Sequence, residues 1–551
     1  MHPRWRRLSL VCLPLVAASC LLAWRGRVAI EARAETYLRR AGLTAGEVRF
    51  SWLGPLRLAA VSGPAPGGGR LTIDSVEVRW RLRGNGEART HVTGVALRGI
   101  RVQRAPLAAS WDEADLDVVA WEREAAAERV TLRQRLGEGE LTARWPPVGA
   151  EPVLSLTRLD LGAANVHWNG EPVLSPGRWS GRLSVERTGA RLQSRGTLHG
   201  DGVRVTPPPP LHTEGGEGAP ATFDVDWTLR HDGRAIEIEH FSARLTGFDV
   251  SAHGVVQGSA ERQADVKIEA HCDLAEAFRT AGLAPPLAEA RSDRFGRASL
   301  DLSLRGPLAD PAALVIEPRL HYEAEPEVLQ ALSYLRGPFP YRPASSPGLV
   351  IDVREGAPAF IPVEAVPHFF QKALLVSEDA GFNQHAGIDV AEIAVAWAEN
   401  EQDGRRLRGA STITQQLVKN LFLSSEKTYG RKLREAALAL MVDAAVPKAR
   451  LLEIYLNIIE WGPGLHGLAP AAQHYFGKRP GDLTPKETAF LVCLIPNPVR
   501  YHQAHEQGRL GPGMEQLVHN LLRKLHSLGE LDDGAYEDAP HEELQFAPEM
   551  S

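Results

Sequence analysis

The stretch that decides the fold of the C-terminal part reads Glu378-Asp-Ala-Gly-Phe-Asn-Gln-His-Ala-Gly-Ile-Asp389 and, further on, Gly409-Ala-Ser-Thr-Ile-Thr-Gln-Gln416. A run of cations follows and ends at a second isolated carboxylate, Glu435; these cations are Lys419, Lys427, Arg431, Lys432 and Arg434. A sugar transfer with an anionic leaving group needs a carboxylate base and cations for the departing charge. The pattern therefore makes an enzyme the leading hypothesis.

Helical patterns surround this stretch. Apolar side chains recur at helical spacing in three segments, which are Phe369–Ser377, Ile393–Trp397 and Leu438–Val442. Asp389 is placed to cap one helix, and Thr484, followed by Pro485 and Glu487, is placed to cap another. Residues 514–531 are expected to form a further helix. The pattern predicts a mainly α domain over residues 349–551.

Residues 26–336 have the pattern of β structure. Apolar residues alternate through Leu71–Trp80, which is typical of a strand with one buried face. Similar runs recur along this region, at Val92–Val102, Val153–Trp168, Phe223–Leu229, Ile236–Val256 and Leu300–Leu304. We expect an elongated, repeat-like β-rich region. The proline-rich segment 337–348 is predicted to be the linker to the helical domain.

The first 25 residues predict a cytoplasmic stub and a membrane anchor. Arginines precede an uncharged run from Leu8 to Trp24, and Arg25 and Arg27 follow it. The run is near the lower length limit for a membrane-spanning helix. A cleaved signal peptide and a lipoprotein signal at Ala17–Cys20 are the alternatives. The flanking charges favour a cytoplasmic N-terminus, with the rest of the chain in the periplasm.

Composition limits the other classes of function. The chain has 551 residues, which suggests two or three domains, and its net charge of −6 gives no case for nucleic-acid binding. The four cysteines are Cys12, Cys20, Cys272 and Cys493, and their spacing indicates neither a metal site nor a disulfide framework.

The C-terminal motifs together resemble a known family. The two quoted segments are followed by Arg431-Lys-Leu-Arg-Glu435, Leu452-Glu-Ile-Tyr-Leu-Asn457 and Tyr475-Phe-Gly-Lys478. This series resembles the glycosyltransferase family 51 peptidoglycan transglycosylases, and the segments 457–464 and 496–498 are most similar to the monofunctional biosynthetic members. The resemblance implies a mainly α, lysozyme-like fold that polymerises lipid II into glycan strands. The β-rich region more loosely resembles AsmA-like β-groove envelope proteins.

The resemblance also assigns roles to site residues. Glu378 is implied as the base that deprotonates the acceptor 4-hydroxyl, and partial burial would raise its pKa for this task. Glu435 matches the second essential carboxylate, in a role that positions the donor or stabilises positive charge at its anomeric carbon. Read from spacing alone, Glu435 and Arg431 could instead form an ordinary i,i+4 surface ion pair.

The remaining candidate residues fall into two groups. Substrate binding is expected from polar and cationic side chains between the two acids, with Ser411 or Thr412 alternatively capping a helix; they are Ser411, Thr412, Gln415, Gln416, Lys419, Asn420, Lys427, Arg431, Lys432 and Arg434. A structural role near the site is expected from Asp379, Phe382, His385 and Gly387. Glu453, Tyr455 and Asn457 are expected to serve the architecture of their helix first.

The resemblance implies a setting as well as a site. Expected partners are lipid II, the nascent glycan strand, membrane lipid and other cell-wall synthesis proteins, without nucleic acid. The location implied is the bacterial inner membrane, with a single span and a periplasmic catalytic domain. The resemblance implies that no cofactor is required. A Mg²⁺ or Mn²⁺ ion that assists the pyrophosphate is left as an alternative, and no metal ligands are predicted.

Two other classes of function remain as alternatives. A lytic transglycosylase or hydrolase would also use a buried Glu, but glycan cleavage releases no pyrophosphate and leaves the cationic run unexplained. A non-catalytic envelope protein would only bind lipid or glycan. Ser424-Ser-Glu-Lys427 fits a Ser-x-x-Lys pattern, yet no Ser-x-Asn or Lys-Thr-Gly element follows it, so transpeptidase activity is not expected.

Overall fold

The computed structural model describes most of the chain after residue 26. The described residues are 27–40, 42–50, 54–64, 70–83, 89–104, 107–124, 127–134, 139–145, 153–157, 165–168, 171–174, 178–188, 191–203, 219–232, 234–258, 262–283, 285–287, 294–308, 310, 313–403, 409–423, 429–539 and 541–548. Among them, no helix is both long and apolar enough to cross a membrane. The predicted anchor at Leu8–Trp24 lies outside these residues.

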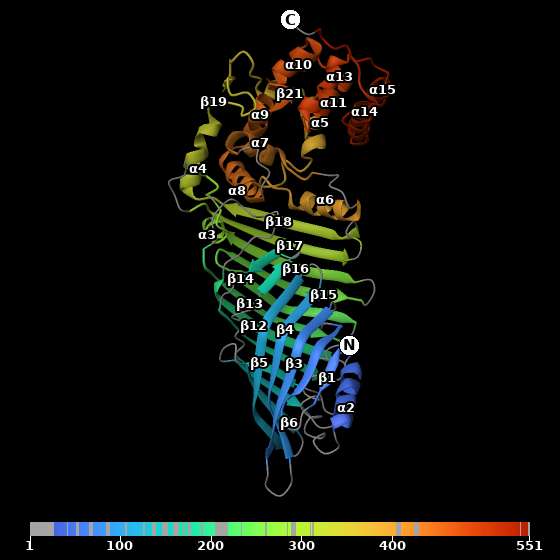
Figure 1. Cartoon of the computed structure of the whole chain (residues 1–551). Helices are drawn as coiled ribbons and strands as arrows, with labels where there is room; N and C mark the ends of the chain where they lie inside the picture. The colour runs from blue at the N-terminus through green and yellow to red at the C-terminus, as the bar shows by residue number, and fades with distance from the viewer. Residues whose placement is uncertain are drawn as a thin grey trace. The chain divides into compact units, whose positions relative to one another are not determined.

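The chain divides into two compact units. The first comprises the described residues of Met1–Cys272, Glu276–Ala284 and Leu300–Glu317. The second comprises those of Asp273–Ala275, Pro285–Ser299 and Pro318–Ser551. The structure thus has a β-rich N-terminal part and a helical C-terminal part, as the sequence predicted (Figure 1).

Antiparallel strands joined in sequence order dominate the first unit. The strands before the first interruption are β1 (Glu47–Arg49), β2 (Leu56–Pro64), β3 (Arg70–Arg83), β4 (Arg89–Arg104), β5 (Leu107–Glu124), β6 (Ala127–Gln134), β7 (Gly139–Trp145) and β8 (Val153–Thr157). Each pairs with the next, from β1–β2 to β7–β8. A hairpin of β9 (Asn165–Trp168) and β10 (Glu171–Leu174) interrupts the succession, and β9 pairs with β5.

The succession resumes when β11 (Arg178–Thr188) pairs with β8. It continues through strands that again pair with their neighbours in sequence; they are β12 (Arg191–Val203), β13 (Ala221–His231), β14 (Ala235–Leu245), β15 (Phe248–Gln257) and β16 (Gln263–Asp273). The same sheet, which has 18 strands among the described residues, also includes β17 (Arg297–Pro307) and β18 (Val315–Glu323). The short helix α3 (Leu274–Thr280) follows β16.

The predicted strand runs fall on observed strands, with two corrections. The run Val153–Trp168 is two strands, β8 and β9, and the run Ile236–Val256 is β14 and β15 joined at a turn. In that turn Gly247 has φ +84°, and a Cβ there would lie 2.6 Å from the backbone N of Ala277. Glycine adopts this positive φ without strain and has no Cβ to clash with Ala277. The chain can therefore reverse at this turn although the apolar pattern of the sequence continues.

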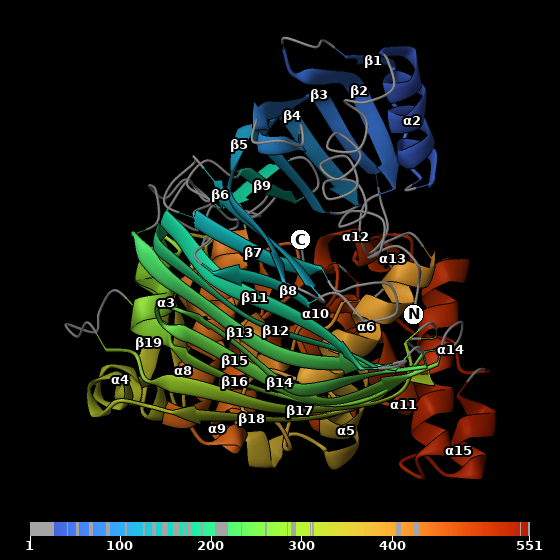
Figure 2. The same cartoon turned by 90° about the horizontal axis from the view of Figure 1, so that it is seen from below.

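A helix that the sequence did not predict precedes the strands. Figure 2 shows α2 (Arg27–Arg40) beside the first strands. Its Ala34 and Leu38 are almost fully buried, as are Leu56 and Leu58 of β2. The Glu31 carboxylate also accepts a hydrogen bond from the Phe50 backbone N–H at 2.8 Å. The helix therefore covers apolar side chains at the N-terminal end of the sheet.

The second unit is built mainly from helices. Those nearest the quoted motifs are α5 (His368–Glu378), α6 (Val390–Asp403), α7 (Ile413–Phe422), α8 (Tyr429–Ala445) and α9 (Lys448–Ile458). Those that follow are α10 (Leu468–Phe476), α11 (Pro485–Leu494), α12 (Pro498–Tyr501), α13 (Gln503–Glu506), α14 (Pro512–Ser527) and α15 (Asp533–Asp538). Residues 486–494 of α11 are all buried, so α11 is a core helix.

Short elements precede and connect these helices. They are α4 (Pro326–Leu332), η2 (Ser333–Arg336), β19 (Phe339–Tyr341), β20 (Ile351–Val353), η3 (Val363–Ala365), β21 (Glu460–Gly462), β22 (Leu465–His466) and η4 (Pro480–Asp482). Both predicted caps are confirmed. Asp389 accepts a hydrogen bond from the Glu392 N–H at 2.9 Å, and Thr484 forms a reciprocal capping box with Glu487.

The structure corrects the predicted linker at residues 337–348. Phe339 and Tyr341 are buried there, and β19 pairs with β20. Arg450 of α9 also donates to the backbone carbonyls of Leu335 and Gly337. The prolines therefore shape a packed segment inside the helical unit. Proline content marks where regular helix stops, but it does not reveal which aromatic side chains the core takes up.

Candidate active site

Glu378 is the last residue of α5. Phe370, Ala373 and Leu374 bury one face of this helix, and the chain leaves the helical conformation at Asp379, whose φ is −164°. Glu378 itself is half-buried. The core packing of α5 thus fixes the backbone that carries this carboxylate, while part of the side chain stays accessible.

Gln416 of α7 connects Glu378 to the buried Tyr455 of α9. The Gln416 amide Nε2 donates to Glu378 Oε2 at 2.9 Å. The Tyr455 hydroxyl donates to Gln416 Oε1, also at 2.9 Å. Because the hydroxyl gives its hydrogen to the amide oxygen, the amide nitrogen is held toward Glu378. Three helices therefore orient one carboxylate.

Burial raises the pKa of Glu378 above its ordinary value. Hydrogen bonds from Gln416 and Ser377 oppose this rise, and the negative charge of Asp379 adds to it. A carboxylate with a raised pKa binds a proton more strongly than an exposed one. The environment of Glu378 therefore suits a general base.

Asp379 organises the loop that follows Glu378. Its Oδ1 lies 2.8 Å from His385 Nε2, and its Oδ2 accepts a hydrogen bond from the backbone N–H of Ile413 at 2.9 Å. Ile413 is the first residue of α7, where a negative charge is favoured by the unpaired N–H groups of the helix end. Asp379 and His385 are both well buried. The pair links the loop to α7 and leaves Glu378 as the accessible acid.

Thr412 and Gln415 form the capping box of α7. The Thr412 hydroxyl accepts from the Gln415 N–H at 3.1 Å, and Gln415 Oε1 accepts from the Thr412 N–H at 3.0 Å. The same hydroxyl donates to the carbonyl of Gly387 at 2.6 Å. Both residues are only 3% exposed. The structure therefore gives them a capping role, and we do not carry them into the proposed substrate-binding set.

Gly387 has a conformation and a space that favour glycine. Its φ is +83°, and a Cβ there would lie 2.4 Å from the carbonyl oxygen of Ala439 in α8. The loop therefore packs closely against α8. This packing helps to hold the Gly387 carbonyl in the position where Thr412 donates to it. Phe382, 2% exposed, lies in the same loop beneath Lys448, whose ammonium is 4.6 Å from the ring centroid. Phe382 is a loop anchor and not a sugar-stacking surface.

Glu435 is buried on α8 between two cations. Arg431 Nη1 donates to its Oε2 at 2.8 Å, and Lys432 Nζ bonds its Oε1. Lys432 also donates to the Ser411 hydroxyl at 2.9 Å. The Glu435 side chain is 3% exposed, so this is not the ordinary surface ion pair that spacing alone allowed. A buried carboxylate holds the cations in place.

One short segment connects the two acidic centres. Ser411, just before the cap of α7, reaches Lys432 and through it Glu435, whereas Gln416 reaches Glu378. Lys419 and Asn420 are exposed on the last turns of α7, and Arg434 is half-buried on α8. Lys427 lies outside the described residues. The structure thus connects Ser411 and Gln416 to the acids and leaves Lys419 and Asn420 accessible on α7.

Two features of the site were missed in the sequence. Asp443 of α8 accepts hydrogen bonds from Lys448 and Thr414, and burial raises its pKa although Lys448 opposes the rise. Cys493 of α11 lies near Glu378, since burial and the Glu378 charge together raise the pKa of its thiol to about 12. Only the i,i+5 spacing of Asp443 and Lys448 was visible in the sequence, and it is too common to indicate a site.

Comparisons with known proteins agree with the motifs. Residues 350–521 match the family described as Transglycosylase, so the helical unit contains a region similar to that family. Similar curated proteins are named biosynthetic peptidoglycan transglycosylase. Identity is 45% over 148 residues for the one from Nitrosomonas eutropha, 42% over 151 for Thiobacillus denitrificans and 47% over 139 for Laribacter hongkongensis. The resemblance predicted from the motifs is therefore confirmed.

These alignments cover part of each protein. They span 27%, 27% and 25% of this chain, and 60%, 65% and 60% of the three relatives. The chain therefore covers less than two thirds of the length of these relatives. A solved structure of penicillin-binding protein 1A from Haemophilus influenzae aligns over 38% of this chain and 21% of that chain, with 17% identity and a TM-score of 0.18, a likeness too low to bear on the fold.

Proposed function

We propose that the helical unit is a peptidoglycan glycosyltransferase that polymerises lipid II into glycan strands and has no transpeptidase activity. The proposal rests chiefly on Glu378, a half-buried carboxylate of raised pKa that Gln416 holds at the end of a core helix. The match of residues 350–521 to the Transglycosylase family supports it. So do the names of the curated relatives.

The proposed reaction is an inverting displacement. Glu378 takes the proton of the acceptor 4-hydroxyl, and the resulting oxygen attacks the anomeric carbon of the donor. The bond from that carbon to the pyrophosphate oxygen breaks, and its electron pair leaves with undecaprenyl pyrophosphate. Because pyrophosphate departs as a stable anion, the step needs a base and cations but no strong acid.

Cations on α7 and α8 are proposed to receive the pyrophosphate. Arg431 can bind phosphate oxygens with two N–H groups, and Lys432 and Lys419 act as point charges. Glu435 is too buried, and too closely paired with Arg431 and Lys432, to be a second free base. We assign it the role of positioning these two cations. Ser411, Gln416, Asn420, Arg434 and Lys427 complete the proposed binding set.

The proposed setting follows the resemblance. The helical unit would have a lysozyme-like fold and act in the periplasm, held at the inner membrane by an anchor at residues 8–24. Lipid II, the growing glycan strand and membrane lipid would be its partners, together with other cell-wall synthesis proteins. The antiparallel sheet of the first unit is compatible with an AsmA-like role in handling lipid or with a spacer role.

The test compares Glu378→Gln with Glu364→Gln on purified full-length protein given lipid II. Glu364 is an exposed carboxylate in η3 of the same unit and serves as the matched control. Loss of a general base lowers the rate by about 10²–10⁴-fold, so polymer should nearly vanish in Glu378→Gln and persist in the control. Polymer length is read on a gel or by chromatography.

Other outcomes would point to the alternatives. Shortening of preformed glycan by the wild type, without polymer from lipid II, would indicate a lytic enzyme. Binding of glycan or lipid with neither reaction would indicate a non-catalytic envelope protein. Equal polymer from Glu378→Gln and wild type would refute Glu378 as the base.

A further inference from the structure

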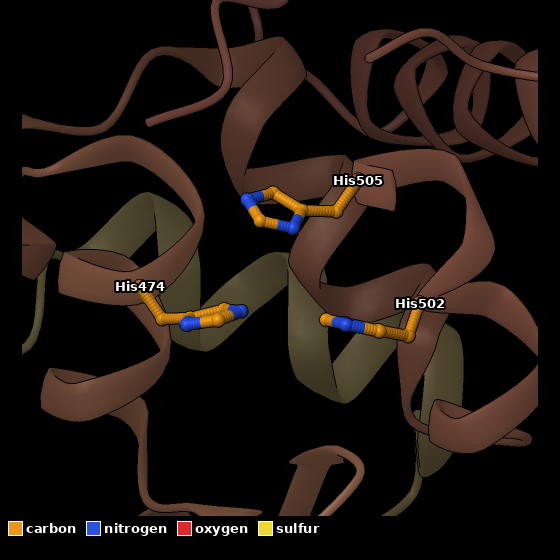
Figure 3. A group of neighbouring side chains, drawn as sticks. All are labelled: His474, His502 and His505. Atoms are coloured by element: carbon orange, nitrogen blue, oxygen red, sulfur yellow. The ribbon is translucent and has the colours of Figure 1, made fainter. Parts of the chain in front are cut away.

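Three histidines outside the candidate active site converge on one point. His474 lies on α10, His502 follows α12, and His505 lies on α13 (Figure 3). One ring nitrogen from each lies within 4.8 Å of the others, and no other group of this kind is found among the described residues. The spacing of the cysteines in the sequence did not indicate this cluster. The only sequence feature that pointed to it was the i,i+3 spacing of His502 and His505.

The separation of these nitrogens is close to what a bound metal ion requires. Zinc binds imidazole nitrogens at about 2.0–2.1 Å, which places two tetrahedral ligands about 3.3 Å apart. The observed limit of 4.8 Å is wider than this, so metal binding would draw the three nitrogens closer together. Three imidazoles with one open position suit Zn²⁺ and neighbouring divalent transition metals. They suit Mg²⁺ or Ca²⁺ poorly, because those ions prefer oxygen ligands.

Hydrogen bonds hold two of the rings in the tautomer that a metal needs. The Tyr475 hydroxyl donates to the Trp461 carbonyl at 2.9 Å and lies 2.8 Å from His502 Nδ1. Since this hydroxyl has one hydrogen, it accepts from His502 Nδ1–H, and His502 Nε2 keeps its lone pair. Metal-binding histidines are commonly oriented in this way by a partner on the other ring nitrogen.

His505 is arranged in the same manner. Its Nε2 lies 3.2 Å from the carbonyl oxygen of Ala547, which can only accept, so Nε2 carries the hydrogen and Nδ1 the lone pair. His505 is 6% exposed, and its Nδ1 is buried with no hydrogen-bond partner among the described residues. A buried acceptor without a hydrogen bond lowers the stability of the fold unless a ligand binds it.

The residues around the three histidine rings are compatible with this arrangement of the rings. A Cβ at Gly462 would lie 2.6 Å from the Tyr475 hydroxyl and 3.3 Å from His502 Nδ1, so the chain has no side chain where it would displace that pair. The rings also contact aromatic neighbours, including Tyr475 and Phe546. Aromatic packing alone would account for the rings being close. It would not account for the buried lone pair on His505 Nδ1, which has no hydrogen-bond partner among the described residues.

We propose that His474, His502 and His505 bind one divalent transition-metal ion of the zinc type, with a water in the fourth position. The ion would tie α10 to α12 and α13. It would also secure the C-terminal segment, because Ala547 bonds both His505 and, through its N–H, the carbonyl of Tyr475. The site is separate from the residues assigned to glycan transfer.

The test uses full-length protein without a polyhistidine tag, stripped of metal with a chelator. Titration with Zn²⁺ by calorimetry should give one tight ion per chain, and Co²⁺ should give the absorption of a four-coordinate site. His474→Gln and His502→Gln should abolish both signals. His541→Gln, an exposed histidine of the same unit, should retain them. Tyr475→Phe removes the partner of His502 Nδ1, together with the hydrogen bond to the Trp461 carbonyl, and should weaken binding about 10–100-fold.

Folding of each variant is checked by circular dichroism in the metal-free state. Wild-type protein that binds no Zn²⁺ tightly would overturn the proposal whatever the variants do. Binding that persists equally in His474→Gln and His502→Gln would also overturn it, because the ion would then sit elsewhere. A rise in the thermal midpoint with Zn²⁺ in the wild type and in His541→Gln, absent from the other two, would support it.

Discussion

At the scale of residues, the candidate site depends on unequal environments for two carboxylates. Glu378 is half-buried and accepts a hydrogen bond from a neutral amide, so burial raises its pKa. Glu435 is buried but lies between Arg431 and Lys432. A carboxylate beside a neutral donor can accept a proton. The oxygens of Glu435 are instead occupied by hydrogen bonds from Arg431 and Lys432. The first therefore suits chemistry and the second suits positioning.

Replacing Gln416 by Ala should change the pH dependence of the proposed glycan transfer. The Gln416 hydrogen bond lowers the pKa of Glu378, so its loss should raise that pKa further. A base acts when deprotonated, so the acid limb of the kcat/KM profile should move to higher pH. Activity at neutral pH should fall on the order of tenfold, as expected for a lost hydrogen bond to a charged group.

The measurement is kcat/KM for lipid II as a function of pH, with Tyr455→Phe beside it. Tyr455 donates only to the amide oxygen of Gln416, so its loss should loosen the amide and move the acid limb less. An acid limb that stays in place in Gln416→Ala, or moves to lower pH, would contradict the assignment of Glu378 as the base.

At the scale of elements, the N-terminus of α7 is the junction of the site. Its cap residue Thr412 bonds the Gly387 loop, and its first N–H bonds Asp379. One turn later, Gln416 bonds Glu378. The helix thus begins where three parts of the site meet, and its cap determines their relative positions. Capping is usually a matter of helix stability alone, but here it also places side chains of the site.

Replacing Thr412 by Ala should destabilise the helical unit by about 1–2 kcal/mol, the upper range for loss of a helix cap, because the hydroxyl also bonds Gly387. Thr412→Ser keeps the hydroxyl and should cost much less. The check is the midpoint of thermal unfolding followed by tryptophan fluorescence. Equal losses of stability in the Ala and Ser variants would show that the methyl group, and not the cap, matters at this position.

At the scale of the whole molecule, each unit contains one described cysteine that forms no disulfide bond. Cys272 belongs to the sheet and is half-buried, whereas Cys493 is buried in α11 of the helical unit. Burial and the charge of Glu378 raise the pKa of the Cys493 thiol to about 12. Because thiolates are the reactive form, Cys493 should report opening of the helical unit.

A thiol reagent at mildly alkaline pH should therefore label Cys272 much faster than Cys493 in the native protein. Raising the pH toward 12 increases the thiolate fraction of Cys493. Burial still keeps the reagent from the thiol, so the labelling rate stays low until the unit unfolds. Labelling of each cysteine is followed by mass spectrometry of the peptides, with protein in denaturant as the reference for full reaction. Equal native rates for the two would contradict the burial of α11.

The sequence alone predicted the division into a β-rich and a helical region and the caps at Asp389 and Thr484. These features are local, because alternation, helical spacing and capping depend on residues a few positions apart. The tertiary structure decided which side chains meet. It buried Glu435 between Arg431 and Lys432, placed Thr412 and Gln415 in a cap, packed residues 337–348 into the helical unit and brought His474 to His502 and His505. Contacts between distant residues follow from how helices bury their apolar faces together, and no single segment contains that information.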